Sequence, residues 1–327
     1  MTPSTLRHRW MPIAAPPPWL SRAIHDSVTS LAVAIALLVP AGALAQANQP
    51  TITYDTVSSQ VLQSVATNLP ESRAVGAAFL SPTYDPNLVL TQAGSARTTF
   101  LSEGAGYRNS LGWFTYQENT FSGLTKSIID TNGDGVVAMP ELNAVSGVSS
   151  GYLFANASAA GSGGSLNAGA TVDVAGGQIL SAGTRLGFFL VQDGFDGTGA
   201  RGGGLGTGQR QIFYSLDFLN PEAAASGTLA NAGSAEARHV AMMFADESRQ
   251  QVILGFEDLN RATSAANVNG YGSDEDFNDT VFTISATPAT VFENSNIYTA
   301  PAPPLEAAAV ALLAVAAYVG RRQRVTA

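Results

Sequence analysis

The stretch Arg185-Leu-Gly-Phe-Phe-Leu-Val191 decides the fold class, because it is almost continuously apolar and rich in aromatic and branched residues. A run this short, bounded by turn-forming residues, predicts a strand buried on both faces, whereas a helix would need at least about ten residues. Similar short runs alternate with clusters of Gly, Asn and Asp along the chain. The runs predicted as strands span residues 88–91, 97–100, 185–191, 211–218, 239–244, 251–256 and 280–284.

Many short strands at this spacing predict an all-β fold, a β-sandwich of jelly-roll type, over residues 87–288. The chain has 327 residues, of which 13% are charged and 33 are Gly, a composition typical of extracellular β-rich modules. It has no cysteine, which excludes disulfides and thiolate metal sites. The N-terminal segment 46–86 predicts a short helix around 57–65 followed by a linker, and the Gly/Ser/Ala-rich stretch 146–170 predicts a loop or linker.

An acidic stretch at 130–141 has the ligand order of a twelve-residue EF-hand loop. Asp130, Asn132 and Asp134 offer oxygens at alternating positions, and the carboxylate of Glu141 closes the loop. The backbone carbonyl of Val136 would supply the ligand at the seventh position. This first site is therefore predicted to bind Ca²⁺.

The residues around these ligands support a short helical, EF-hand-like insertion at 120–145. Gly135 supplies the positive φ that the turn requires, and Val137 is expected to point into the core. Helix-like flanks are expected at 124–129 and 140–145. A single loop would bind calcium weakly, with a dissociation constant on the order of 10⁻⁴–10⁻³ M. The alternative is a plain turn rich in Asn and Asp.

A second acidic site is predicted where two strands end close together. Glu257 and Asp258 follow the strand 251–256, and Asp279 precedes the strand 280–284. Crowded carboxylates repel one another unless a cation neutralises them, so these strand ends are expected to converge on one calcium ion. The alternative is a solvated acidic turn. The predicted ligands are Glu257, Asp258, Asp274, Asp276, Asn278 and Asp279.

The same acidic residues carry a resemblance to a known family. Phe256-Glu-Asp-Leu259, then Ser273-Asp-Glu-Asp-Phe-Asn-Asp279 with Val281-Phe282, resembles the signature of the bacterial family called domain of unknown function 4114. Segments 186–190 and 100–114 are similar to parts of such proteins, so the resemblance spans residues 98–286. It implies a secreted or surface β-rich domain with Ca²⁺ at the acidic motif and no assigned enzymatic activity. The EF-hand-like segment lies outside the signature and is predicted to be an insertion.

The N-terminus predicts export. Basic residues precede a short apolar run at 31–38, and Ala43-Leu-Ala45 forms a small-x-small cleavage site. These three features in this order are typical of a signal peptide, which is assigned to residues 1–45.

The C-terminus predicts a sorting or anchoring segment. A Pro-containing linker at 289–304 leads into the segment 305–327, in which an apolar run is followed by an arginine cluster. This layout resembles the PEP-CTERM sorting signal of Gram-negative bacteria, which implies a cell-surface, outer-membrane-associated or extracellular location. The apolar run 307–319 is about 20 Å long as a helix, against a hydrocarbon core of ~30 Å. A weak membrane anchor is the alternative.

Charge narrows the choice of partners. Residues 46–300 contain 23 acidic and 10 basic residues, a net charge of −13. Such a surface disfavours nucleic acid and anionic membranes and suits cations, so contact with the membrane is expected only through the C-terminal segment. The predicted function is a non-enzymatic, calcium-binding structural or adhesive protein of the bacterial exterior or extracellular matrix. Its expected partners are calcium ions and exopolysaccharide or other surface proteins.

Two other functions stay open. One is a calcium-dependent carbohydrate-binding module, and the weaker is a secreted hydrolase, for which Glu257 and Asp279 are the carboxylate pair.

His239, which begins an apolar run, is predicted to be a structural histidine of a strand edge with its hydrogen bonds satisfied. Trp113, Phe114 and Tyr116 are predicted to pack in the core, and a sugar-stacking platform is the alternative for them.

Overall fold

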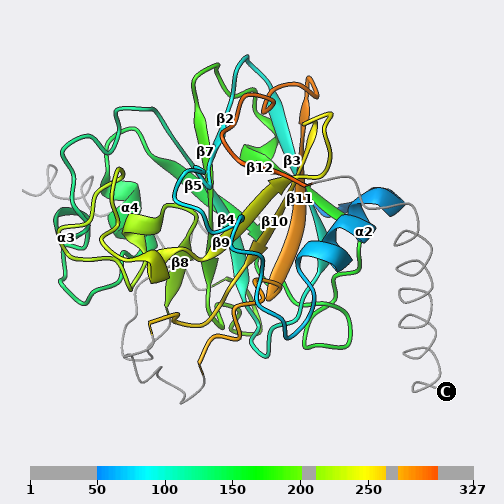
Figure 1. Cartoon of the computed structure of the whole chain (residues 1–327), viewed down its shortest axis with the longest axis horizontal. Helices are drawn as coiled ribbons and strands as arrows, with labels where there is room; N and C mark the ends of the chain where they lie inside the picture. Colours follow the sequence, from blue (N-terminus) through cyan, green and yellow to red (C-terminus); the bar gives the residue numbers. More distant parts are fainter. Residues whose placement is uncertain (1–49, 201–210, 263–271, 301–327) are drawn as a thin grey trace, which may run out of the picture. The chain divides into compact units, whose positions relative to one another are not determined.

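A computed structural model describes residues 50–200, 211–262 and 272–300. The predicted signal peptide and C-terminal sorting segment lie outside the described residues. Within the described ranges, no helix is long and apolar enough to cross a lipid bilayer. Strands dominate this part of the chain and form two sheets (Figure 1).

The elements follow one another along the chain with two short helices between β4 and β5. In order they are β1 (Thr53–Tyr54), α2 (Ser59–Asn68), β2 (Leu88–Val89), β3 (Ser95–Ser102), β4 (Ser110–Tyr116), α3 (Lys126–Ile129), α4 (Met139–Ala144), β5 (Ser149–Phe154), β6 (Ala170–Asp173), η1 (Val174–Gly177), β7 (Arg185–Val191), β8 (Ile212–Tyr214), η2 (Asp217–Leu219), η3 (Ala235–Ala237), β9 (Val240–Phe244), β10 (Gln251–Phe256), β11 (Thr280–Thr287) and β12 (Tyr298–Thr299).

The two sheets confirm the predicted all-β sandwich. The larger has seven strands in the order β1-β6-β3-β11-β10-β9-β12. The smaller has the order β2-β7-β4-β5, and β8 also pairs with β7. All pairs are antiparallel except β12 with β9. With seven and five strands, the sandwich is larger than a jelly roll of eight.

Burial on both faces of β7 explains its continuous apolar sequence. Leu186, Phe188 and Leu190 point into the main core between the two sheets. Phe189 and Val191 point the other way, into a second core on the outer face of the smaller sheet. Since successive side chains of a strand alternate between faces, a strand covered on both sides has no position left for polar residues.

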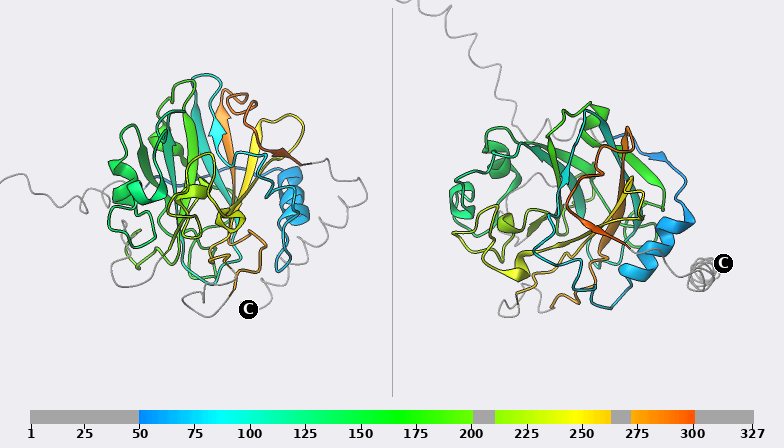
Figure 2. Two further views of the ribbon diagram at one scale, coloured as in Figure 1. Left: turned by 60° about the vertical axis from the view of Figure 1, so that its left-hand side comes forward. Right: turned by 45° about the horizontal axis from the view of Figure 1, so that its top comes forward.

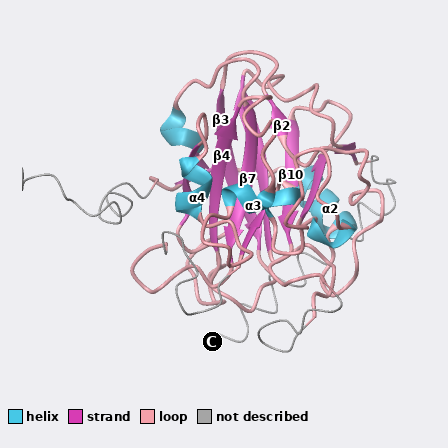
Figure 3. Cartoon of the chain, turned by 90° about the vertical axis from the view of Figure 1, so that its left-hand side faces the viewer, coloured by secondary structure: helices cyan, strands magenta, loops and turns pink. Residues whose placement is uncertain are grey.

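The helical insertion covers that outer face. Ile129, Val137 and Leu142 of the 126–144 region pack in the second core with Phe114 and Tyr116. The view from the side of the insertion shows α3 and α4 in front of the strands (Figure 3). The two helices expected in the 120–145 region are present, and the inward position of Val137 and the core packing of Phe114 and Tyr116 are confirmed. Trp113 is partly buried and packs against the main core.

Helix α2 covers the outer face of the larger sheet (Figure 2). Its buried residues Val61 and Val65 belong to a third core with Met243 of β9 and Ile253 of β10. The Oγ of Ser58 caps the helix by accepting a hydrogen bond from the Val61 N–H at 3.3 Å. The helix predicted near 57–65 is therefore present, and it continues to Asn68.

Two sequence predictions about strands are wrong. The 146–170 stretch, predicted as a loop, contains β5, which pairs with β4. Its glycine Gly151 packs against the Trp113 ring, where an added Cβ would come within 3.0 Å, so the small residue serves packing and not flexibility. The predicted 211–218 strand ends at Tyr214 because the Asn220 side chain bonds both the N–H and the carbonyl of Tyr214, at 2.6 and 2.8 Å.

Candidate metal centre

Strand pairing brings the second predicted site together at one end of the larger sheet. The last residue of β10, Phe256, pairs with the first residue of β11, Thr280. Glu257 and Asp258 therefore leave one strand beside the point where Asp279 enters the next. The Asp279 carboxylate Oδ2 accepts a hydrogen bond from the Asp258 N–H at 2.7 Å, which fixes the two chain segments to each other.

Five carboxylates meet there and are called the acidic cluster below. Two groups have ligand oxygens that all lie within 4.8 Å of one another, and both contain Glu257. The five residues of the acidic cluster are Glu257, Asp258, Asp274, Asp276 and Asp279. The sixth predicted ligand, Asn278, is turned elsewhere: its Oδ1 lies against Gly104, and its Nδ2 donates to Glu71 at 3.2 Å.

Glu257 is the centre of the acidic cluster and is fully buried. Its exposed fraction is 0%, and its Oε2 is buried without any hydrogen-bond partner. Its Oε1 receives a long contact of 3.4 Å from the Leu259 N–H, and a side-chain hydrogen bond with Ser273 offsets part of the effect of burial on the Glu257 pKa. Within the described residues, no ion pair joins a member of the acidic cluster to Lys, Arg or His. A buried carboxylate in this position requires either a proton or a metal cation.

The electrostatics of the acidic cluster agree with this requirement. Burial, reinforced by the charge of Asp258, raises the pKa of Glu257 to about 8. Burial raises the pKa of Asp258 to about 6. Burial and then the charges of Asp258 and Glu257 raise the pKa of Asp279 well above its usual value. Without a cation Glu257 stays protonated at neutral pH and Asp258 loses its proton just below it, and a divalent ion would take the place of such protons.

The local backbone sets which side chains of the 274–279 segment face the acidic cluster. Glu275 and Phe277 have positive φ angles of 63° and 54°. Glu275 points away and forms an ion pair with Arg261 at 2.6 Å, and the guanidinium of Arg261 lies over the Phe277 ring. The neighbouring side chains of Asp274 and Asp276 instead lie close to Glu257. The basic residue near this segment thus neutralises Glu275 and not the acidic cluster.

Residues from outside the predicted motif complete the site. The Asn109 side chain, which directly precedes β4, donates to Asp258 Oδ2 at 2.6 Å. Gln192, which follows β7, donates to the Asp258 carbonyl at 2.7 Å, and the Ser72 N–H donates to Asp276 Oδ2 at 2.7 Å. Sequence reasoning missed all three, because neutral residues this far from the acidic motif carry no local signal. Asn109 did lie in one of the segments that resemble the family.

The predicted hydrogen bonding of His239 is confirmed. It is fully buried beside the acidic cluster, and its ring stacks on Phe213 with centroids 4.0 Å apart. Nδ1 lies 2.8 Å from the Glu257 carbonyl, and Nε2 lies 3.0 Å from Glu222 Oε1. Both ring nitrogens are therefore occupied, and the ring supports the backbone of Glu257.

Gly255 is required for the acidic cluster to form. A Cβ at this position would overlap the carbonyl oxygen of Phe277, so only glycine lets the 274–279 segment approach β10 this closely. We expect Gly255→Ala to destabilise the protein by about 1–3 kcal/mol, because it forces the two backbones apart. Chemical denaturation measures this change. Ala241→Gly, on the neighbouring strand β9, is the control for a one-carbon change in the same sheet, and a neutral Gly255→Ala would contradict the argument.

The first predicted site, 130–141, has a different geometry. Gly135 has a φ of 88°, as predicted. The Asp130 carboxylate accepts hydrogen bonds from the N–H groups of Gly133 and Gly135 at 3.0 and 2.9 Å. Asn132 Oδ1 accepts from the Asp134 N–H at 2.8 Å, and Asp134 Oδ1 accepts from the Val136 N–H at 2.9 Å. The loop is thus preformed by bonds from its own side chains to its own backbone.

Glu141 closes this loop through both of its oxygens. Oε1 accepts from the N–H groups of Thr131 and Asn132 at 2.7 and 3.1 Å, and Oε2 accepts from the Ala138 N–H at 2.8 Å. Burial alone would raise the pKa of Glu141, but these hydrogen bonds outweigh it and lower the pKa. The groups with oxygens within 4.8 Å do not include Asp130, Asp134 and Glu141 among the described residues. Calcium at this loop remains a prediction.

Fold and site together define a β-sandwich that carries an acidic cluster, centred on the buried Glu257, where β10 and β11 meet. Residues 180–287 match the family described as domain of unknown function (DUF4114), which agrees with the resemblance found in the sequence. The match covers β7 to β11 and so includes the whole acidic cluster. It begins at residue 180, so the earlier part of the expected resemblance, 98–179, lies outside it. No curated protein matches the chain, and no solved structure does.

Proposed function

We propose that the acidic cluster is a calcium site and that this protein is a non-enzymatic structural or adhesive component of the bacterial exterior. The observation that carries the proposal is the unpartnered, fully buried oxygen of Glu257 amid four further carboxylates. Ca²⁺ is the fitting ion because it takes six to eight hard oxygen ligands, and neither histidine nor thiolate is available in the cluster.

Calcium would stabilise the sandwich because it binds the native state. It would join the end of β10 to the segment that leads into β11, where repulsion between carboxylates opposes folding. The chain has no cysteine for disulfides, so a cation is the available cross-link in an exported protein. Export and surface location rest on the terminal segments of the sequence, and exopolysaccharide or other surface proteins are the proposed partners.

Metal analysis of the purified protein tests the proposal directly. We expect calcium to remain with the protein after gel filtration in calcium-containing buffer and to be removed by EDTA. Glu257→Gln is expected to lose the tighter class of binding in calorimetry, because Glu257 belongs to both groups of ligands. Asp130→Ala is expected to lose a separate, weaker event at the 130–141 loop. Unchanged calcium stoichiometry in Glu257→Gln would exclude the acidic cluster as the site, and an unchanged count in Asp130→Ala would exclude the loop.

A further inference from the structure

A cavity of about 840 Å³ is lined by both polar and apolar side chains, among them Arg238, and is called the Arg238 cavity below. It is formed by the 80–87 segment before β2, the first residue of β7, the 215–218 segment after β8 and the 229–235 loop. Its volume falls in the range of about 300–1,000 Å³ that is typical of small-ligand sites. None of its lining residues belongs to the acidic cluster. We propose that it binds a neutral, polyhydroxylated ligand of saccharide type.

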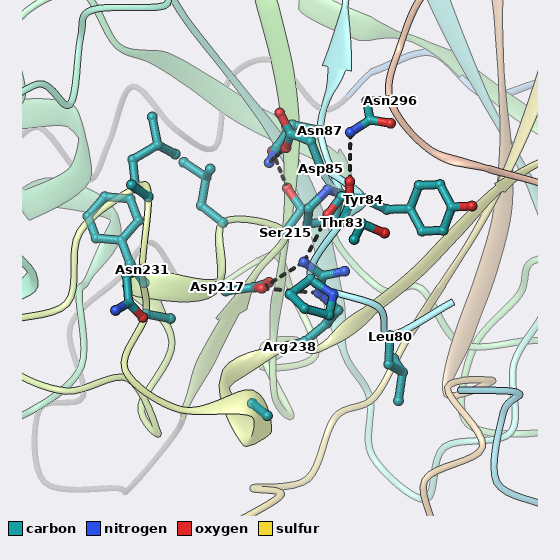
Figure 4. Close-up of a pocket in the computed structure, with 18 of the residues that line it drawn as sticks. Leu80, Thr83, Tyr84, Asp85, Asn87, Ser215, Asp217, Asn231, Arg238 and Asn296 are labelled. Atoms are coloured by element: carbon teal, nitrogen blue, oxygen red, sulfur yellow. Dashed lines mark hydrogen bonds and ion pairs between the residues drawn. The ribbon is translucent and has the colours of Figure 1, made fainter. Parts of the chain in front are cut away.

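The polar side chains of the cavity are held in place by one another (Figure 4). Arg238 donates to Asp217 Oδ2 at 2.9 and 3.0 Å and to the carbonyls of Ser81 and Tyr84. The fully buried Ser215 hydroxyl donates to Asn87 Oδ1 at 2.8 Å. Donors and acceptors that are oriented before the ligand arrives cost less entropy on binding, which is the property of a preorganised site.

Charge pairing in the lining favours a neutral ligand. Arg185 pairs with Asp85 at 3.1 Å and with Glu118 at 3.7 Å, and Arg238 pairs with Asp217. Both arginines of the lining are therefore already neutralised by carboxylates, so an anion would have to displace one of these pairs. A hydroxyl group can instead bond to the remaining acceptor and donor positions without breaking a pair.

The other lining residues match both surfaces of a sugar ring, its polar hydroxyl groups and its apolar C–H faces. Asn231 Oδ1 already accepts from the Gly233 N–H, and Asn296 Nδ2 already donates to the Thr83 carbonyl. The exposed amides of Asn231 and Asn296 therefore offer a ligand hydroxyl chiefly a donor and an acceptor, respectively. Leu229, which is 39% exposed, and Leu80 offer apolar contact for the C–H faces of the ring. The Asp217 side chain is 26% exposed; its Oδ2 is held by Arg238, and its Oδ1 is buried without a hydrogen-bond partner, so it is an unsatisfied acceptor in the lining. Apolar and polar groups thus line the same cavity.

Calorimetric titration with short neutral oligosaccharides built on glucose, mannose, xylose and N-acetylglucosamine tests the proposal. Oligouronates and chitosan oligomers are the anionic and cationic probes. We expect at least one neutral series to bind and both charged series to bind more weakly. Binding should persist in EDTA and in Glu257→Gln, because the Arg238 cavity and the acidic cluster share no residue. Absence of binding by every neutral series, or a preference for a charged series, would overturn the proposal.

Substitutions in the lining test whether the ligand binds in the Arg238 cavity. Asp217→Asn removes a charged acceptor and is expected to raise the dissociation constant about tenfold. Because Asp217 also anchors Arg238, the exposed rim variant Asn231→Ala is the second test, with an expected increase of severalfold. Its control is Gln178→Ala, which also removes an exposed amide but lies outside the lining. Equal affinities for Asn231→Ala and Gln178→Ala would place the ligand elsewhere.

Discussion

Calcium is expected to raise the melting temperature of the protein by roughly 5–10 °C, and Glu257→Gln is expected to remove most of this increase. At a free calcium concentration 100 times the dissociation constant, binding adds about 2.7 kcal/mol to the free energy of unfolding. For a domain of this size, each kcal/mol corresponds to about 2–4 °C. Glu257 belongs to both ligand groups, so its loss leaves neither group complete.

The same variant is expected to have the opposite effect without calcium. In EDTA, Glu257→Gln replaces a buried carboxyl group whose Oε2 has no partner, so the variant should melt at a higher temperature than the unmodified protein. Scanning calorimetry in EDTA and in millimolar calcium measures both effects. Glu247→Gln changes an exposed carboxylate outside the acidic cluster and is the matched control. A full calcium response in Glu257→Gln would show that the ion binds elsewhere.

Stability of the calcium-free protein is expected to fall as the pH rises from 5 to 8. The pKa of Asp258 is raised to about 6 and that of Glu257 to about 8, whereas both carboxyls have values near 4 in the unfolded chain. Between these limits the folded protein binds more protons than the unfolded chain, so raising the pH favours unfolding. The stabilising contribution of the protonated groups is therefore complete below about pH 4 and is lost as the pH passes 6 and then 8. The total loss amounts to several kcal/mol, and Glu257, whose pKa is raised more, contributes the larger share.

Urea denaturation at a series of pH values, in EDTA and in saturating calcium, measures this dependence. Saturating calcium should flatten the profile, because the ion takes the place of the protons and leaves the carboxylates ionised. Its stabilising effect should grow with pH, since fewer protons compete for the ligands. Glu141 and Glu222, whose pKa values are lowered, affect stability only below about pH 5 and lie outside this range. A calcium-free profile that rises between pH 5 and 8 would contradict the assignment of buried, protonated carboxyls.

The strands that the sequence predicted best are those buried on both faces. The bounds of β7 and β10 match the predicted runs, because both strands lie between two apolar cores and need apolar residues at every position. The strand β5 was missed because its small residues pack against a large partner, Trp113, which lies elsewhere in the sequence. The end of β8 was missed for a similar reason, since the Asn220 side chain takes over the backbone bonds of Tyr214.

The sequence by itself determined the fold class and identified the residues of the acidic cluster. Apolar runs of strand length and closely spaced carboxylates are local patterns, so both can be recognised without a structure. Only the tertiary structure decided which carboxylates meet and which do not. Strand pairing brings Glu257 to Asp279, whereas Arg261 draws Glu275 away and the backbone of the 130–141 loop occupies Glu141. The Arg238 cavity depended on the structure entirely, because its residues come from distant segments that carry no shared sequence pattern.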